Sequence, residues 1–267
     1  MAPILTLTTD FGLTDHYAGT MKGVILNRCP GATIVDISHE VTPFSIWSGA
    51  YTIDQAAPYF PAGTVHAVVV DPGVGTSRRA ILAEAIGQLF VAPDNGVLSM
   101  ILSRDSGASV REITNPQLFL EPLSSTFHGR DLFAPVAASL ASGTVGSDRV
   151  GPLLSRPELL PDLEPLKVAN GNWLGRVLSV DRFGNVITNF RASRFREDSF
   201  AIRFRKRVVE TYRKTFSGAA EGECFVYSGS SGFIELAINQ GNAAGFLGIS
   251  PGDKIELHLT KPIKHKP

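Results

Sequence analysis

Three polar loops of this 267-residue sequence contain the side chains whose types and spacing could carry out chemistry. The loops cover residues 9–15, 71–78 and 124–131. In an α/β sheet, ligands bind where loops leave the carboxyl ends of the strands. The polar residues of these loops are therefore the first candidates for a binding or catalytic site.

Asp10 and Asp15 are the carboxylates of the first loop. A carboxylate that follows a strand can accept hydrogen bonds from both hydroxyls of a ribose diol, and it can equally cap a turn or a helix. The spacing leaves both roles open for Asp10. Asp15 lies just before an apolar pattern of helical period, so the spacing favours a helix cap at Asp15 or at Thr14.

Asp71 and Arg78 lie seven residues apart across the second loop, which allows an ion pair at the end of a strand. Such a pair would keep the carboxylate ionised and place a cation beside a ligand, or it could only hold the loop in shape. The intervening glycines do not indicate a phosphate cradle, because neither Gly-Lys-Ser/Thr nor a third glycine follows. In the third loop His128 stands alone, and a lone histidine is more often structural than catalytic.

Two later segments, residues 181–189 and 227–239, are rich in amide, hydroxyl and carboxylate groups. The amide of Asn185 has a donor and an acceptor side by side, which suits the edge of an adenine ring. Gly184 and Asn185 are also typical of a hairpin turn, and the spacing alone favours the turn.

The overall composition excludes several classes of protein. The chain has 25 basic and 25 acidic residues, so no net charge attracts it to nucleic acid or to anionic lipid. Cys29 and Cys224 stand far apart and outside any zinc-binding spacing, which disfavours a disulfide framework and a structural zinc site. No apolar window is long enough to span a bilayer, and the first residues do not resemble a signal peptide. We expect a soluble cytoplasmic protein.

The elements that must position the three loops alternate between strand and helix. Apolar or β-branched runs predict strands at residues 4–8, 33–37, 65–70, 80–84 and 89–92, and helical spacing predicts helices from Tyr17, from Phe44 and over 97–102. Thr42 and Pro43 would begin the second of these helices. The pattern predicts an α/β domain with a mostly parallel central sheet over residues 1–150.

The rest of the chain has a different pattern. Residues 151–171 contain several prolines and no sustained period, which predicts a linker. Residues 172–267 have runs of strand length joined by Gly-rich or charged segments, which predicts a smaller β-barrel or sandwich. These runs cover residues 174–180, 199–204, 224–227, 233–238 and 254–259.

Taken together, the motifs of both parts resemble one family, the S-adenosylmethionine (SAM) hydrolases, or SAM hydroxide adenosyltransferases, which are relatives of the fluorinase and chlorinase. The motifs occur in order over nearly the whole chain. They are Thr9-Asp-Phe-Gly12, Asp71-Pro-Gly-Val-Gly-Thr-x-Arg-Arg79, Pro93-Asp-Asn-Gly96, Thr126-Phe-His-Gly-Arg-Asp131, Asp181-x-Phe-Gly-Asn-x-x-Thr-Asn189 and Ser230-x-Gly-x-x-Glu-x-Ala-x-Asn239.

The resemblance implies an N-terminal α/β domain, a C-terminal β-barrel, and a homotrimer with sites between the N-terminal domain of one subunit and the C-terminal domain of its neighbour. It implies attack of water on ribose C5′ of SAM, which gives adenosine and methionine without a metal or cofactor. The family's Asp-Arg-His set, which positions and activates the water, falls on Asp71, Arg78 and His128.

The resemblance also implies contacts with the rest of the substrate. The matching positions are Asp10 for the ribose diol, Trp47 for packing on the ribose, Asn185 for the adenine, Asp15 and Asp181 for the methionine amine, and Ser230 and Ser231 for its carboxylate. The halogenases carry Tyr, Thr and Ser where this sequence has Asp71, Val74 and Gly129, and an arginine where it has Ser231. The alternatives to a hydrolase are a SAM-dependent halogenase and a non-catalytic protein that binds adenosine or SAM.

Overall fold

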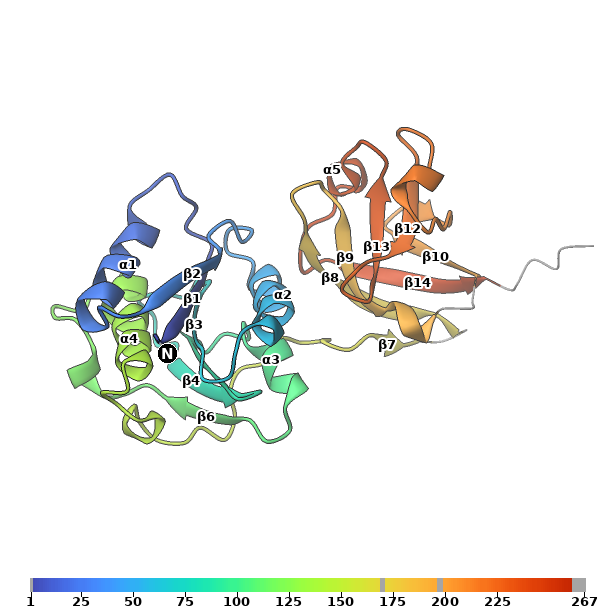
Figure 1. The fold of residues 1–267 in the computed structure, drawn as a ribbon. Coiled ribbons are helices and arrows are strands. Elements are labelled where there is room, and N and C mark those ends of the chain that lie inside the picture. The colour runs from blue at the N-terminus through green and yellow to red at the C-terminus, as the bar shows by residue number, and fades with distance from the viewer. Residues whose placement is uncertain (1, 169–170, 196–198, 261–267) are drawn as a thin grey trace, which may run out of the picture. The chain divides into compact units, whose positions relative to one another are not determined.

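The computed structural model describes residues 2–168, 171–195 and 199–260 (Figure 1). The contacts among its residues divide the chain into two units, Met1–Leu160 and Pro161–Pro267. Of the predicted domain ranges, residues 169 and 170 of the linker and residues 261–267 of the barrel lie outside the described residues, as do 1 and 196–198. The first unit is an α/β layer structure and the second is built mainly of strands.

The sheet of the first unit has the spatial order β2-β1-β3-β5-β4-β6. The strands β2, β1, β3 and β5 are parallel, whereas β4 is antiparallel to β5 and β6. The predicted α/β fold with a mostly parallel sheet is confirmed. The strands of this sheet are β1 Ile4–Thr9, β2 Thr33–Ser38, β3 Val65–Val69, β4 Ala80–Ala85, β5 Gln88–Pro93 and β6 Ser109–Glu112.

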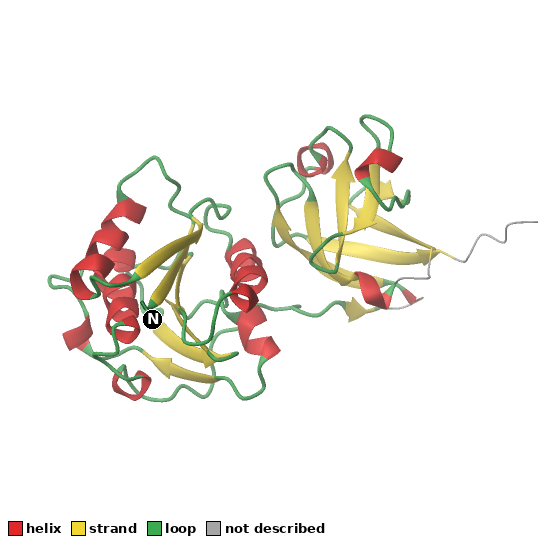
Figure 2. Cartoon of the chain, in the orientation of Figure 1, coloured by secondary structure: helices red, strands yellow, loops and turns green. Residues whose placement is uncertain are grey.

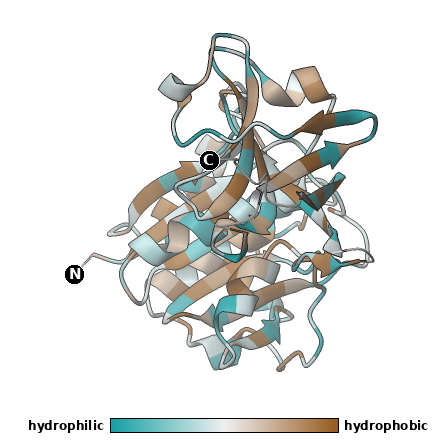
Figure 3. Ribbon diagram, turned by 90° about the vertical axis from the view of Figure 1, so that its right-hand side faces the viewer, coloured by the Kyte–Doolittle hydropathy of each residue, from teal (hydrophilic) through white to brown (hydrophobic). Residues whose placement is uncertain are grey.

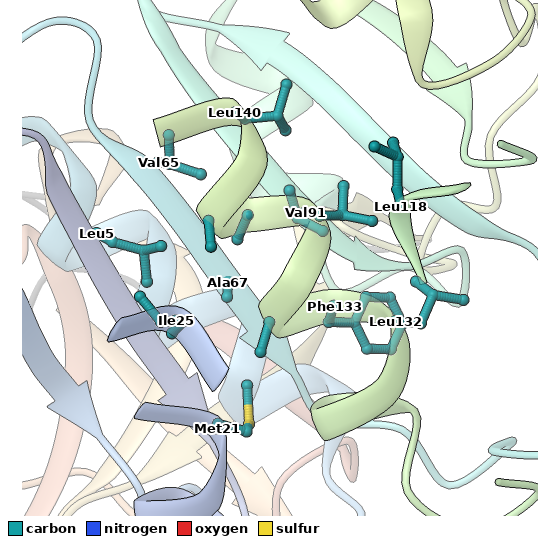
Figure 4. Close-up of a cluster of buried hydrophobic side chains, with 14 of the residues drawn as sticks. Leu5, Met21, Ile25, Val65, Ala67, Val91, Leu118, Leu132, Phe133 and Leu140 are labelled. Carbon is teal, nitrogen blue, oxygen red and sulfur yellow. The ribbon is translucent and has the colours of Figure 1, made fainter. Parts of the chain in front are cut away.

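Helices cover both faces of this sheet (Figures 1 and 2). On one face α1 (Tyr17–Arg28) and α4 (Ala134–Ala141) enclose the core cluster drawn in Figure 4. On the other face, α2 (Ile46–Ala56) and α3 (Ser99–Arg104) pack against the same strands. No described helix combines the length and the apolar character that crossing a membrane requires.

The start of α1 corrects one prediction. Thr14 and Asp15 are exposed, and neither caps the helix, which begins after His16 without a side-chain cap. Because Asp15 does not cap the helix, its carboxylate is available for another role.

The start of α2 corrects a second prediction. Its cap is Ser45, whose hydroxyl accepts a hydrogen bond from the backbone N–H of Ser48 at 3.2 Å, so Thr42 and Pro43 lie outside the helix. Phe44 has a φ of 63°, a left-handed conformation that a helix cannot contain. The helix therefore begins only after Phe44.

The sheet of the second unit has the order β11-β10-β14-β8-β9-β13-β12, with β7 also paired to β8. The chain after β11 closes the sheet, because Val226 donates to the carbonyl of Thr211 at 2.8 Å and its own carbonyl accepts from Arg213 at 2.9 Å. The predicted barrel is confirmed. Its strands are β7 Leu166–Lys167, β8 Trp173–Val180, β9 Val186–Arg191, β10 Ser199–Phe204, β11 Arg207–Val209, β12 Cys224–Ser228, β13 Phe233–Ile238 and β14 Lys254–Thr260, with α5 Ala243–Leu247.

Hydrophobic residues recur along the strands and helices of both units, coloured brown in Figure 3. In the barrel, side chains that alternate along β9, β13 and β14 meet in one core that includes Phe190, Ile234 and Leu257. The alternate residues of β13 face away from that core, among them Glu235, which is nevertheless buried.

Candidate active site

Two loops of the first unit, residues 71–78 and 124–131, bring the predicted catalytic residues together. Asp71 follows β3, Arg78 precedes β4, and His128 directly precedes the π-helical turn Gly129–Phe133 that leads into α4. Nε of Arg78 donates to the carboxylate oxygens Oδ1 and Oδ2 of Asp71 at 2.9 and 3.0 Å, and Nη2 also donates to Oδ2. The side chains of Asp71 and Arg78 are only 4% and 10% exposed, so this ion pair is held largely away from water.

The same guanidinium binds the imidazole of His128, with Nη2 at 2.7 Å from Nδ1. Because arginine has only donors, Nδ1 must be the acceptor, and the ring therefore carries its proton on Nε2 when neutral. Burial and the nearby charge of Arg78 lower the pKa of His128, while Asp71 and Asp131 act in the opposite direction. Asp71, Arg78 and His128 thus form one connected group with a neutral imidazole at neutral pH.

Two further contacts support this group. The guanidinium carbon of Arg78 lies 5.2 Å from the centre of the Phe133 ring, which adds a cation–π contact. Gly75 has a φ of 77°, and a Cβ on it would overlap the backbone oxygen of Ser125. The second and third loops therefore pack so closely that only glycine fits at position 75.

Asp10 lies beside this group. Its Oδ2 accepts a hydrogen bond from the backbone N–H of Phe44 at 2.8 Å. Burial raises the pKa of Asp10, the Phe44 contact lowers it, and the charge of Asp71 raises it again. Because Asp71 contributes, the two carboxylates are near enough to interact. Phe44 was not predicted as a site residue, and its positive φ leaves no trace in the sequence pattern.

The structure does not join the other two predicted residues of the first unit to this group. Asp15 is exposed in the loop between β1 and α1, and Trp47 is half-buried in the first turn of α2. Among the described residues, no hydrogen bond or ion pair connects Asp15 or Trp47 to Asp71, Arg78 or His128. Their predicted substrate contacts stay predictions.

The second unit contains a hollow of about 690 Å³ at the loop that joins β8 and β9. Asp181 organises this loop: its Oδ1 accepts from the backbone N–H groups of Phe183 and Asn185 at 2.9 and 2.8 Å, and its Oδ2 accepts from Nδ2 of Asn185 at 2.8 Å. Asn185 therefore takes part in the turn and also lines the hollow. The residues that line it are Asp181, Phe183, Asn185, Phe216, Ile238, Gln240, Gly241 and Asn242.

The predicted serines lie at the loop between β12 and β13. Ser230 is exposed, and the hydroxyl of Ser231 donates to Oε1 of Glu235 at 3.4 Å. Glu235 was not predicted as a site residue, although it lies inside one of the motifs. A charged residue in the middle of the apolar run Phe233–Ile238 is the signal that could have singled it out.

Nothing in these two sites has the form of a metal centre. Among the residues that the structure describes, no group of at least three His, Cys, Asp or Glu side chains is placed to hold a metal ion. The chemistry available is that of an ion pair and a neutral imidazole in the first unit, and of aromatic rings, amides and carboxylates in the second.

Comparison with known proteins matches both units. The family models described as the SAM hydroxide adenosyltransferase N-terminal and C-terminal domains match residues 5–151 and 175–256. The chain is 39% identical over 265 residues to the (R)-S-adenosyl-L-methionine hydrolase of Thermus thermophilus, covering 96% of this chain and 100% of that protein. A fluorinase of Actinoplanes sp. is 29% identical, with 89% of this chain and 91% of that protein covered. The crystal structure of an uncharacterized conserved protein from Thermotoga maritima superimposes with a TM-score of 0.84 at 42% identity, covering 96% and 99% of the two chains.

Proposed function

This chain belongs to the SAM hydroxide adenosyltransferase family, and we propose that it hydrolyses S-adenosyl-L-methionine to adenosine and L-methionine. The observation that carries the proposal is the hydrogen-bonded group of Asp71, Arg78 and His128, whose Asp71–Arg78 ion pair is held largely away from water. It supplies a carboxylate and a cation in fixed positions, as activation of a water molecule requires. The hydrolase of Thermus thermophilus, alike over its full length, supports the same assignment.

In the proposed reaction, the water oxygen forms a bond to ribose C5′ while the C5′–S bond breaks. The electron pair of that bond goes to sulfur, which leaves as a neutral thioether, so no general acid is needed. The proton that water loses goes to Asp71 and then to solvent. Arg78 stabilises the negative charge that develops on the attacking oxygen. The reaction as proposed uses no metal and no cofactor.

His128 completes the group by accepting a hydrogen bond from Arg78, which fixes the direction of the guanidinium. Its proton on Nε2 makes it a donor toward the water rather than a base. We assign the base to Asp71 for this reason.

The remaining contacts follow the family resemblance. Asp10 would hold the ribose diol, with Trp47 against the ribose. Asn185 would bind the adenine in the hollow of the second unit, where Phe183 and Phe216 offer aromatic surface. Asp15, Asp181, Ser230 and Ser231 would contact the methionine part.

The homotrimer implied by the resemblance is part of the proposal. Light scattering coupled to size-exclusion chromatography of the full chain would then give three times the mass of one chain. A monomer that retains full activity would contradict this part alone.

The reaction is tested by incubating the protein with SAM in ¹⁸O-labelled water and separating the adenosyl products by chromatography with mass detection. We expect adenosine with one ¹⁸O in its 5′-hydroxyl, together with methionine. Parallel reactions with chloride and fluoride would yield 5′-halo-5′-deoxyadenosine if the protein were a halogenase. Tight binding of SAM without any product would identify a binding protein instead.

A further inference from the structure

His39 is a buried histidine that directly follows β2, and no step of the proposed reaction uses it. The residue is 3% exposed, and its Nδ1 lies 2.8 Å from the hydroxyl oxygen of Thr9, the last residue of β1. Its Nε2 lies 3.1 Å from Oδ1 of Asp36, which also pairs with Lys22. Because a carboxylate only accepts, Nε2 carries the ring proton, and Nδ1 of the neutral ring accepts from the Thr9 hydroxyl.

The Thr9 hydroxyl connects this ring to the turn that contains Asp10. Its oxygen also accepts a hydrogen bond from the backbone N–H of Phe11 at 3.3 Å. Thr9 is fully buried, so water does not replace the ring as the partner of its hydroxyl. The chain of contacts from His39 through Thr9 to Phe11 therefore spans Asp10 from one side to the other.

The segment after β2 also holds this loop through its backbone. The carbonyl of His39 accepts from the backbone N–H of Gly12 at 2.7 Å, and the N–H of Val41 donates to the carbonyl of Thr9 at 3.3 Å. These bonds do not depend on the His39 side chain. The bond between the imidazole and Thr9 can therefore be removed while the backbone contacts stay.

The direction of the Asp10 carboxylate decides whether it can bind a diol. The backbone N–H of Phe44 holds Oδ2 at 2.8 Å, and the turn that carries Asp10 determines where the carboxylate stands against that N–H. Two neighbouring hydroxyls present their donors at a fixed separation. A carboxylate displaced by about 1 Å would no longer bind both hydroxyls well.

We propose that His39 is a positioning residue that, through Thr9, holds Asp10 in the orientation that selects a nucleoside with an intact 2′,3′-diol. The inference rests on the ribose contact proposed above for Asp10 and deepens it. It names the part of the substrate that this buried histidine controls, although the ring itself touches no substrate.

The test measures how strongly the full chain prefers a diol. We would determine by calorimetry the Kd of adenosine and of 2′,3′-dideoxyadenosine, which differ only in the two hydroxyls. Wild type should bind adenosine more tightly, because a site built to bind hydroxyls rejects the analogue that lacks them. His39→Leu removes both ring nitrogens at similar size and should reduce this preference about tenfold, by weakening adenosine alone.

Two further variants separate positioning from a general loss of structure. His39→Asn places an amide oxygen where Nδ1 stands, so it should retain most of the preference for adenosine. Asp10→Ala should remove the preference, and His39→Leu added to Asp10→Ala should not reduce it further, since the histidine acts only through Asp10.

A matched control and a second route guard against misfolding. His66→Gln changes another buried histidine of the same sheet, whose ring bonds Thr6 and Gln88, and it should leave both Kd values unchanged. If His39→Leu does not fold, Thr9→Val removes the same bond with almost no change of shape. It should reduce the preference for adenosine to the same extent.

The outcomes for this inference and for the proposed function are distinct. The inference is wrong if wild type binds the two nucleosides equally, if His39→Leu weakens both of them equally or neither, or if His39→Asn loses as much preference as His39→Leu. If the preference behaves as expected but SAM yields no adenosine, the hydrolase proposal fails and the role of His39 stands.

Discussion

Two histidines of the first unit accept a hydrogen bond at Nδ1 and have a lowered pKa, yet their surroundings differ. His66 on β3 is fully buried; its Nδ1 lies 2.7 Å from the hydroxyl of Thr6, its Nε2 lies 3.2 Å from Oε1 of Gln88, and its ring stacks on Phe90. His128 is half-buried in a loop and binds the guanidinium of Arg78. Every polar atom of the His66 ring is bonded to an uncharged group, whereas His128 belongs to a set of charged groups.

A lowered pKa therefore does not by itself identify a catalytic histidine. For both rings burial is the largest cause of the shift, and for His66 it brings the pKa to about 4. What distinguishes His128 is its link through Arg78 to Asp71, at the carboxyl end of a strand. We therefore expect changes around His128 to alter turnover and changes at His66 to alter stability.

The largest expected effect is on turnover, from Asp71→Asn. This variant keeps the shape of the side chain but removes the charge that pairs with Arg78 and the proposed proton acceptor. We expect kcat to fall roughly 10²-fold or more, with SAM affinity nearly unchanged. Turnover by the product assay and affinity by calorimetry would measure the two quantities. Glu158→Gln, at an exposed carboxylate, is the matched control, and near-normal turnover in Asp71→Asn would refute the assignment.

The second prediction concerns the pH dependence of stability at His66. In the unfolded chain His66 takes up a proton near pH 6.5, but in the folded chain only near 4. The unfolded state therefore binds more protons in this window, and the free energy of unfolding should fall by roughly 3 kcal/mol as the pH drops from 6.5 to 4. Denaturant titrations at several pH values would measure this slope.

His66→Gln removes the titrating group and should flatten the slope, whatever it does to stability at neutral pH. Turnover of this variant at pH 7.5 should equal that of wild type. An unchanged slope would show that other groups cause the acid sensitivity, and a large loss of turnover would break the distinction between the two histidines.

Much of the fold was predictable because its strands are short apolar runs between polar loops, as β3 and β13 illustrate. β9 was missed because Val186–Arg191 begins within a segment whose amides and Asp181 resemble a loop. α4 was missed because all but its last residue are buried, so it has no polar face to reveal a helical period. Helix starts were predicted wrongly where backbone conformation decides, as at Phe44.

The pairing of two site residues could be predicted where the two residues are close in sequence. Asp71 and Arg78 are seven residues apart, and their pairing is confirmed. The bond between Arg78 and His128 spans 50 residues, which no local pattern reports, and only the family resemblance grouped them. Glu235 stands out in the sequence as a charge in an apolar run, but a strand position does not report the hydroxyls that bind it. The individual substrate contacts stay predictions.

The smallest of the three effects should come from His128 itself, because it acts on the water only together with Arg78. His128→Ala removes the acceptor that orients Nη2 but leaves the ion pair with Asp71, so we expect kcat to fall about tenfold. His128→Asn offers an amide oxygen to Arg78 and should recover part of this loss. If His128→Asn and His128→Ala were equally slow, the Nε2 proton rather than the bond to Arg78 would be the contribution of the ring. If both matched wild type, His128 would be structural, as His66 is.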